Sequence, residues 1–302
     1  MTENIVEKII ELKKKRNAVI LAHNYQLPEI QDIADHTGDS LELARKATQI
    51  DCEVIVFCGV SFMGETAHIL SPEKTVLLPD PAAGCPLADM VDIHELRSMK
   101  QEHPGATTIC YVNSSAEVKA ESDICCTSAN AVKVVQSLNG ANPIIFVPCK
   151  FLGGYVSRMT GKDLVLARGY CPTHRRILRE TIVKLKEEMP DAVVMTHPEC
   201  ASDVLEVSDY VCSTSQMFRA VEESGARRFI VGTELGMLHP LRKRYPDREF
   251  FPTSDKAVCP NMKRTTLEKV LWALEKMQYK VELDPEIRAR ALNSLERMLE
   301  HV

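Results

Sequence analysis

The sequence predicts an α/β protein made of three homologous three-layer αβα domains with parallel sheets, related by pseudo-threefold symmetry around a central cavity. Three observations support this fold class. A strand–helix–strand pattern occurs three times, its copies are spaced by about 85 residues, and each copy is followed by a loop with one Cys-Pro pair. Strands that alternate with helices are typical of parallel βαβ units whose helices cover both faces of the sheet.

The first strand of each repeat is a short apolar or β-branched run that ends in a polar cluster. These runs are AVILAHNY (18–25), TTICYVNS (107–114) and AVVMTHPE (192–199), and they begin 89 and 85 residues apart. Because ligands bind beyond the carboxyl ends of parallel strands, we expect the polar clusters to face the central cavity.

A helix begins about twenty residues after the start of each first strand. The three openings are GDSLELARKA (38–47), CTSANAVKVV (126–135) and CSTSQMFRAV (212–221). Ser40, Ser128 and Thr214 stand where an N-cap belongs and are 88 and 86 residues apart. The free N–H groups and positive dipole ends of such helices favour a carboxylate or a phosphate.

A second strand follows each of these helices. The second strands are EVIVFCGV (53–60), PIIFVPCK (143–150) and RFIVGTEL (228–235). After each second strand we expect one loop that carries a Cys-Pro pair. The resulting domains span 1–88, 89–173 and 174–261.

The C-terminal segment 262–302 adds two predicted helices. LEKVLWALEKM has apolar residues at helical spacing, and Asp284 with Pro285 offers an N-cap and a first-turn proline for the last helix. We expect both helices to pack back on the first domain, so that 262–302 belongs to it.

Composition and charge exclude several classes of partner. Hydrophobic residues make up 45% and charged residues 26% of the 302 positions, close to the globular average. A net charge of −5 without a basic stripe argues against nucleic acid. The N-terminal segment lacks the apolar core of a secretory signal, and no run reaches the roughly 18 apolar residues of a membrane span. We therefore expect a cytoplasmic protein with no membrane partner.

Eleven cysteines are unusual for a protein of a reducing compartment, and an odd number fits a complete disulfide framework poorly. Three of them share the repeat period: Cys85, Cys171 and Cys259 each precede a proline and are 86 and 88 residues apart. If equivalent loops meet on the axis, three thiolates converge. This set fits a [4Fe–4S] cluster with three cysteine ligands and one open iron, which binds substrate as a Lewis acid.

Other interpretations of these cysteines stay open. Free cysteine is commonly a small core residue. Cys171 and His174, three apart in GYCPTH, are a possible ligand pair for a zinc-dependent aldolase or hydrolase, although zinc sites usually recruit four ligands in local pairs. A cluster-bearing sensor without catalytic activity is a further possibility, but no DNA-binding or partner-binding module is visible in the sequence.

The strand ends and helix starts offer the groups needed to bind a small polyanionic substrate. They contribute His23, Asn24, Tyr25, Tyr111, Asn113, His197 and Glu199 from strands, and Ser40, Ser128, Ser213 and Thr214 from helices. Beside an anionic substrate, Glu199 is expected to have a raised pKa and to take part in proton transfer. Tyr25 and His197 are further acid/base candidates.

A set of short motifs resembles the quinolinate synthase family, the A protein of de novo NAD synthesis. The motifs run in family order: AHNYQ (22–26), GDS (38–40), FMGETA (62–67), YVNSSAEVKA (111–120), CTSANAV (126–132), GYCPTH (169–174), HPEC (197–200), STSQM (213–217) and CPNMK (259–263). The combination is highly specific and covers most of the chain.

The resemblance implies a triangular arrangement of three domains around a central active site with an oxygen-sensitive [4Fe–4S] cluster. By motif match, Cys85, Cys171 and Cys259 would hold the cluster. Tyr25 and Glu199 look like the proton-transfer pair of the family. Further catalytic residues would be His174, His197 and Tyr111. The substrate would be held by His23, Ser40, Tyr111, Asn113, Ser128, His197, Glu199, Ser213 and Thr214.

The resemblance also implies the reaction. Members of the family condense iminosuccinate (iminoaspartate) with dihydroxyacetone phosphate to quinolinate, with loss of phosphate and water. They are transferases that condense and dehydrate these two small molecules. A functional link to the enzyme that supplies iminosuccinate follows as an expectation. Some longer members carry additional cysteines beside the third ligand, whereas Cys259 stands alone here.

Overall fold

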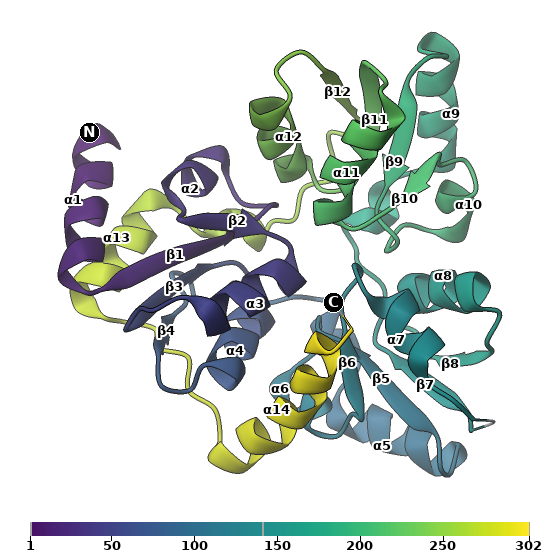
Figure 1. Ribbon diagram of the computed structural model, residues 1–302, viewed down its shortest axis with the longest axis horizontal. Helices are drawn as coiled ribbons and strands as arrows, with labels where there is room; N and C mark the ends of the chain where they lie inside the picture. Colours follow the sequence, from purple (N-terminus) through teal and green to yellow (C-terminus); the bar gives the residue numbers. More distant parts are fainter. Residues whose placement is uncertain (1, 141, 302) are drawn as a thin grey trace.

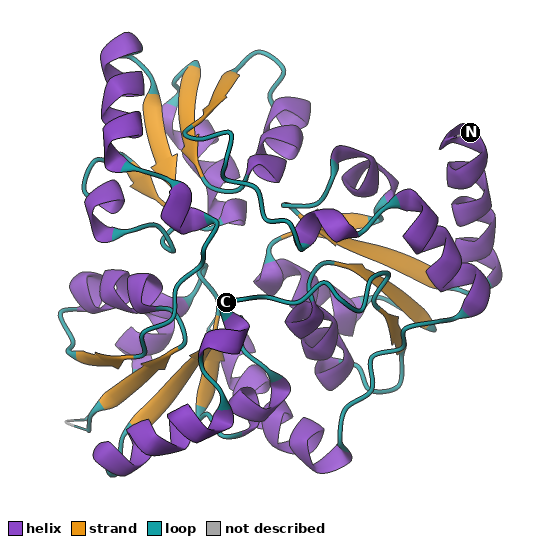
Figure 2. Cartoon of the chain, turned by 180° about the vertical axis from the view of Figure 1, so that it is seen from behind, coloured by secondary structure: helices purple, strands orange, loops and turns teal. Residues whose placement is uncertain are grey.

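A computed structural model describes residues 2–140 and 142–301. Three lobes, each built on a four-stranded sheet, form a triangle around the centre of the molecule (Figure 1). Seen from behind, each sheet is covered by helices (Figure 2). All strand pairs are parallel, so the predicted fold class of three αβα units with parallel sheets is confirmed.

The first unit carries a sheet with the order β2-β1-β3-β4. Its elements are α1 (Thr2–Lys15), β1 (Ala18–His23), α2 (Pro28–Ile33), β2 (His36–Gly38), α3 (Ser40–Gln49), β3 (Val54–Cys58), α4 (Ser61–Leu70), β4 (Thr75–Leu77) and the 3-10 turn η1 (Ala88–Met90). The central strands β1 and β3 are almost fully buried, because helices lie on both faces of the sheet.

The second unit repeats this order as β6-β5-β7-β8. Its elements are α5 (Ile93–Glu102), β5 (Thr107–Tyr111), α6 (Ala116–Ala120), β6 (Ile124–Cys126), α7 (Ala131–Ser137), β7 (Ile144–Val147), α8 (Lys150–Thr160), β8 (Leu164–Leu166) and η2 (His174–Arg176). Both predicted strands of this unit are shorter than their sequence patterns, because the chain leaves the sheet after Tyr111 and after Val147.

The third unit has the order β10-β9-β11-β12. Its elements are α9 (Arg179–Glu188), β9 (Val193–Thr196), α10 (Ser202–Leu205), β10 (Tyr210–Val211), α11 (Thr214–Ser224), β11 (Arg228–Gly232), η3 (Leu235–Met237), α12 (Leu238–Arg244), β12 (Glu249–Pro252) and η4 (Met262–Arg264). The chain ends with α13 (Leu267–Lys276) and α14 (Pro285–Leu299).

One aspartate marks the same place in every unit. It stands directly before the outer strand β2, β6 or β10, and its carboxylate accepts a backbone N–H near the start of the first strand. The three pairs are Ile20–Asp35 at 2.7 Å, Thr108–Asp123 at 2.7 Å and Val194–Asp209 at 2.8 Å. The donors are 88 and 86 residues apart, so these bonds define equivalent positions for the whole repeat.

Two details of the predicted repeat were wrong. Each sheet has four strands, since the outer strands of two to four residues are too short to leave a pattern in the sequence. The cysteine loop therefore does not follow the second predicted strand directly. A helix and the fourth strand, such as α4 and β4 in the first unit, lie between them.

The predicted N-caps also shift. Asp39 caps α3 with its carboxylate, and Ser213 caps α11, both in capping boxes. Ser40 and Thr214 are instead the first helical residues. In the second unit the helix starts later, after Asn130, so Ser128 lies in the preceding loop. The cap position thus belongs to the residue before the predicted one at two of the three helices.

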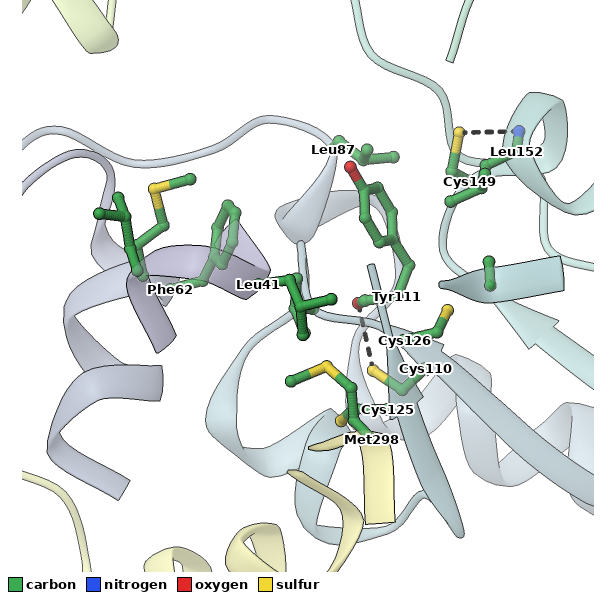
Figure 3. Close-up of a cluster of buried hydrophobic side chains, with 14 of the residues drawn as sticks. Leu41, Phe62, Leu87, Cys110, Tyr111, Cys125, Cys126, Cys149, Leu152 and Met298 are labelled. Carbon is green, nitrogen blue, oxygen red and sulfur yellow. Dashed lines mark hydrogen bonds between the residues drawn. The ribbon is translucent and has the colours of Figure 1, made fainter. Parts of the chain in front are cut away.

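The main hydrophobic core is continuous between units. Leu41 and Phe62 from the first unit lie near Tyr111 of the second and Met298 of α14 (Figure 3). Buried thiols fill much of this region, among them Cys110, Cys125, Cys126 and Cys149. These cysteines behave as small core residues.

The C-terminal helices pack on two different units. Helix α13 lies against α1 and β3, as expected. Helix α14, in contrast, lies against α6, β6 and α4 (Figure 1), and Ser294 Oγ donates to the Lys119 carbonyl at 2.9 Å. Helix α14 therefore packs between the two units, and it contacts the first unit, as expected, through α4.

The connection between the two helices explains this placement. It runs beside β4, where Val281 N–H donates to the Val76 carbonyl at 2.8 Å. The chain is thereby carried along the edge of the first sheet before α14 begins. The boundaries proposed for the three domains stay a prediction. None of the helices within the described residues is both long and apolar enough to cross a bilayer.

Candidate functional site

A cavity of about 650 Å³ lies where the carboxyl ends of the three sheets meet. Thirteen of the fourteen predicted site residues line it: His23, Tyr25, Ser40, Cys85, Tyr111, Asn113, Ser128, Cys171, His174, His197, Glu199, Thr214 and Cys259. Ser213 is the exception. Its Oγ accepts the Gln216 N–H as the N-cap of α11. The fold therefore brings thirteen of the predicted residues to one cavity, and their roles stay predictions.

The register of the three sheets places the site residues at equivalent positions. At the carboxyl ends of the first strands lie His23 and Tyr111, the last residues of β1 and β5, and His197, which directly follows β9. Two positions later stand Tyr25, Asn113 and Glu199. Ser40, Ser128 and Thr214 also occupy equivalent positions. Each stands twenty residues after the backbone N–H that donates to the aspartate of its unit. One backbone framework thus presents different side chains from three sides.

The three cysteine loops share one backbone arrangement. A residue beyond each third strand donates its N–H to the carbonyl two positions before the cysteine. The bonds are Ser61–Ala83 at 2.8 Å, Lys150–Gly169 at 2.8 Å and Leu235–Ala257 at 3.0 Å. Each cysteine begins a turn that leads into η1, η2 or η4, which brings Cys85, Cys171 and Cys259 to the same cavity.

The cysteines of these loops are partly buried, and their thiols face backbone donors. Burial raises the pKa of Cys85 to about 12, and it also raises the pKa of Cys171 and of Cys259. The N–H groups two and three residues further on hydrogen-bond to each sulfur and oppose this rise. Such donors stabilise a thiolate, and a bound metal would compensate the cost of burying it.

The donor set fits a thiolate-bound metal centre. All eleven cysteines lie within the described residues and are free thiols. Cys85, Cys171 and Cys259 are the three described cysteines that line the cavity. A β-carbon placed on Gly84 would meet no atom within 4 Å, so there is open space beside Cys85. Sulfur ligands with directed N–H groups and adjacent space are typical of iron–sulfur sites.

A second group of ligand atoms is also close together. One ligand atom each from Cys171, His174 and Glu199 lies within 4.8 Å of the others. His174 Nδ1 is 2.8 Å from Glu199 Oε2 and 3.2 Å from Cys171 Sγ. A mixed set of sulfur, nitrogen and oxygen ligands is compatible with zinc, so the Cys171–His174 pair of the sequence analysis has a geometric basis.

Glu199 is fully enclosed in the site. Burial by itself would raise its pKa, but His174, both by charge and by its hydrogen bond, lowers the pKa of Glu199 to about 2, with smaller contributions from His197 and Tyr111. Asn113 Nδ2 also donates to Oε1 at 3.4 Å. The neighbouring histidine outweighs burial, so the carboxylate is ionised, and the raised pKa expected beside an anionic substrate stays a prediction.

Two histidines at equivalent positions have the same tautomer. The N–H of Tyr25 donates to His23 Nδ1 at 3.1 Å, and the N–H of Glu199 donates to His197 Nδ1 at 3.3 Å. Since a backbone N–H can only donate, each ring carries its hydrogen on Nε2. Burial lowers the pKa of both rings to about 3, so they are neutral. His197 Nε2 thus donates to Ser128 Oγ at 3.1 Å.

Tyr25 is connected to Glu199 through two side chains. Its hydroxyl is 2.5 Å from Thr233 Oγ1, and Thr233 Oγ1 is 2.9 Å from His174 Nε2. His174 Nδ1 then reaches Glu199. Burial, followed by the Glu199 charge, raises the pKa of Tyr25 well above its usual range, with the Thr233 bond opposing. The phenol is therefore protonated.

Several residues of the site were missed by the sequence analysis. They are Asp39, Thr127, Thr173, Thr233, Glu234 and Met262. Asp39 and Thr127 occupy the position of Ser213 in the other two units, so the same repeat spacing could have found them. Thr233 and Glu234 were assigned to a strand, and β11 ends just before them at Gly232.

Comparison with known proteins places the chain in a family. A family model described as Quinolinate synthetase A protein matches residues 7–300. The proteins named quinolinate synthase from Dehalococcoides mccartyi (strain CBDB1) and Methanosarcina barkeri (strain Fusaro) are 58% and 54% identical over 297 and 295 residues, covering 98% of this chain and 98% and 97% of theirs. That from Thermodesulfovibrio yellowstonii is 51% identical over 300 residues, 99% of both chains. The resemblance seen in the motifs is confirmed, and the chain belongs to the quinolinate synthase family of enzymes.

Proposed function

We propose that this protein is a quinolinate synthase that condenses iminosuccinate with dihydroxyacetone phosphate, with loss of phosphate and water, in NAD biosynthesis. Membership of the family supports the activity. The observation that carries the proposal is the convergence of Cys85, Cys171 and Cys259, from three equivalent loops, on a cavity lined with acid/base groups.

Cys85, Cys171 and Cys259 would hold a [4Fe–4S] cluster with one open iron. When bound, such a cluster supplies a Lewis acid for a substrate oxygen. The N–H groups directed at each sulfur would stabilise the ligating thiolates. His174 is close enough to Cys171 to donate a further hydrogen bond from Nδ1, in competition with Glu199.

Other residues of the cavity lining would bind the anionic ends of the substrates. Ser40 and Thr214 begin helices of ten and eleven residues, whose N–H groups favour carboxylate or phosphate. The neutral rings of His23 and His197 offer Nε2 hydrogens, and Ser128 lies beside His197. Tyr111 and Asn113 line the same cavity. Ser213 would act indirectly, by capping α11 and holding Thr214 at its first turn.

Proton transfer would use the chain from Tyr25 to Glu199. Glu199 is ionised and therefore acts as the base that takes a proton from substrate carbon or nitrogen. Tyr25 is protonated and acts as the acid toward a leaving oxygen. Thr233 and His174 connect the two groups by hydrogen bonds, so the proton removed by one can be returned through the other.

Anaerobic purification tests this function directly. The protein should be brown, contain about four iron and four sulfide per chain, and form quinolinate from the two substrates. One zinc and no sulfide would overturn the cluster and favour the Cys171–His174–Glu199 group as the metal site. A protein that holds the cluster but makes no quinolinate would overturn the activity.

The supply of iminosuccinate implies a partner enzyme. Imines of small acids hydrolyse in water, so an enzyme that oxidises an amino acid must deliver this substrate close to its site of use. Adding such an enzyme to the assay should raise quinolinate yield more than adding an equal total amount of preformed imine. Equal yields would argue against a functional link.

A further inference from the structure

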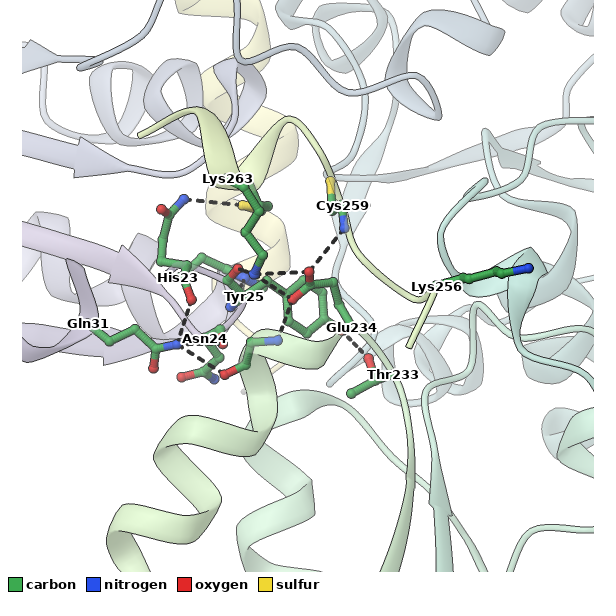
Figure 4. A network of polar contacts seen from close by, with 12 residues as sticks. His23, Asn24, Tyr25, Gln31, Thr233, Glu234, Lys256, Cys259 and Lys263 are labelled. Carbon is green, nitrogen blue, oxygen red and sulfur yellow. Dashed lines mark hydrogen bonds and ion pairs between the residues drawn. The ribbon is translucent and has the colours of Figure 1, made fainter. Parts of the chain in front are cut away.

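The loop that follows Cys259 is held by a buried carboxylate. Glu234 Oε1 accepts the backbone N–H of Cys259 at 3.0 Å, and Oε2 accepts that of Gly236 at 2.7 Å (Figure 4). The same carboxylate forms an ion pair with Lys263 Nζ at 3.0 Å. The Glu234 side chain is completely inaccessible to solvent, so these contacts are not weakened by water.

This loop also reaches into the first unit at two points. Lys263 Nζ donates to the carbonyl of Tyr25 at 2.5 Å, and Asn261 Nδ2 donates to the carbonyl of Gly84 at 2.7 Å. Gly84 directly precedes Cys85. The segment 259–263 is therefore bonded to the neighbour of a second cysteine and to the backbone of the proposed acid.

The other two units lack this arrangement. The register of the sheets places Val60 and Cys149 at the position of Glu234, and neither side chain is a carboxylate. Their cysteine loops form the shared backbone bond without a carboxylate at this position. Within residues 2–140 and 142–301, Cys259 is the one cavity cysteine whose backbone N–H meets a side-chain acceptor. The fold of the loop therefore does not require Glu234.

We propose that Glu234 is a positioning residue which, together with Lys263, sets the place of the Cys259 thiol relative to Cys85 and to Tyr25. A buried ion pair adds little net stability over apolar residues of similar size, but its hydrogen bonds select one geometry. Asn261 completes the connection on the Cys85 side. The inference rests on the proposed function, since it takes Cys259 as a cluster ligand.

Hydrogen–deuterium exchange on the full-length, anaerobically purified protein tests the positioning role without reference to turnover. In the double variant Glu234→Leu, Lys263→Met, which keeps the volume and leaves no unpaired charge, the Cys259 amide should exchange about tenfold faster. The loops of Cys85 and Cys171 should be unchanged. In Glu234→Gln, which keeps an acceptor, the increase should be much smaller.

Cys149→Ser is the matched control, because it alters the equivalent position in the second unit. It should leave exchange in the Cys171 loop as in the wild type. An unchanged Cys259 amide in the double variant would overturn the proposal. So would faster exchange spread over β9–β12, which would indicate a general structural role.

Iron release to a chelator gives a second measurement. The double variant should lose iron about tenfold faster than the wild type, the usual scale for loss of a group that orients a metal ligand. Faster exchange of the Cys259 amide together with an unchanged rate of iron release would show that Glu234 does not influence how the cluster is held. If the wild type holds no iron and sulfide, the proposed function fails, and the exchange result alone decides whether Glu234 positions the Cys259 loop.

Discussion

The loops of Cys171 and Cys259 occupy the same place in neighbouring units but have different surroundings. Three residues after Cys171 stands His174, which contacts Glu199 and Thr233 inside the cavity. Three residues after Cys259 stands Met262, and the polar contacts of that loop come from Glu234. The loop of Cys171 thus places a histidine in the cavity. The loop of Cys259 is hydrogen-bonded to the first unit instead. A symmetric backbone brings the thiols together, while single substitutions at equivalent positions make each side of the site different.

Removing any cavity cysteine should have the largest effect. Cys85→Ala, Cys171→Ala and Cys259→Ala should each abolish the cluster absorption and the activity, because a [4Fe–4S] centre with three ligands has none to spare. Cys52→Ala serves as the control, since Cys52 is buried away from the cavity. If one of the three variants kept its full iron and sulfide, the cysteine changed in that variant would not be a cluster ligand.

We expect proton transfer to depend on Glu199, which lies beside His174 on the side of Cys171. Glu199→Gln removes the ionised carboxylate while keeping its shape, and it should lower kcat by about 10²- to 10⁴-fold with the absorption spectrum unchanged. Single-turnover kinetics together with iron analysis would measure this. Retained activity in a variant with full cluster content would move the base elsewhere in the site.

Thr233→Val should remove the shorter connection between Tyr25 and His174 and leave only the direct contact of 3.4 Å between the Tyr25 hydroxyl and His174 Nε2. The variant keeps the volume but has no hydroxyl for the bonds of 2.5 and 2.9 Å, so kcat should fall by about tenfold. Thr233→Ser keeps the hydroxyl and should retain most of the activity. Equal rates for the serine and valine variants would show that the bridge has no part in turnover.

Gly236→Ala tests the close packing on the side of Cys259. A β-carbon at this position would lie 2.7 Å from the Tyr25 carbonyl carbon and 2.8 Å from its α-carbon, so backbone must move. We expect a loss of about 1–3 kcal/mol in unfolding free energy. Gly154 lies in helix α8, and a β-carbon there would have its nearest neighbour 4.0 Å away, so Gly154→Ala should be neutral or stabilising. Denaturant titration would compare the two, and a neutral Gly236→Ala would contradict the tight contact.

The smallest expected effect concerns Asp80, which joins the segment before Cys85 to that after Cys259. Arg264 and Lys269 lie 3.1 and 2.7 Å from its carboxylate. Burial would raise the pKa of Asp80, but Lys269, Ala82 N–H and Arg264 lower it. A lowered folded pKa means that the stabilisation is present above the ordinary value of 3.8 and is lost as the pH falls below it.

Asp80→Asn should remove this pH dependence and about 1 kcal/mol at neutral pH, since both cationic partners are partly exposed. Unfolding free energies measured between pH 3 and 7 would show the difference between the two proteins. Parallel curves for wild type and variant would exclude a contribution from Asp80.

Errors in the sequence analysis fall where the local pattern does not specify the tertiary contacts. Thr233 and Glu234 continue an apolar run and were assigned to a strand, yet they belong to the loop beyond β11. Helix α14 has an apolar face that includes Ala291, Leu295 and Met298, but such a face does not specify its partner. The path of the preceding segment along β4 determined that α14 packs on the second unit.

The sequence by itself determined the repeat and the positions that share it. Apolar periodicity and the 86- to 88-residue intervals are properties of the chain, so Cys85, Cys171 and Cys259 could be grouped without a structure. The tertiary structure decided which loops meet, and with them the contacts of Glu199 with His174 and of Glu234 with Cys259. It also decided the direction of the Glu199 pKa. These features depend on distances between residues far apart in sequence and on the exclusion of water, which no local pattern encodes.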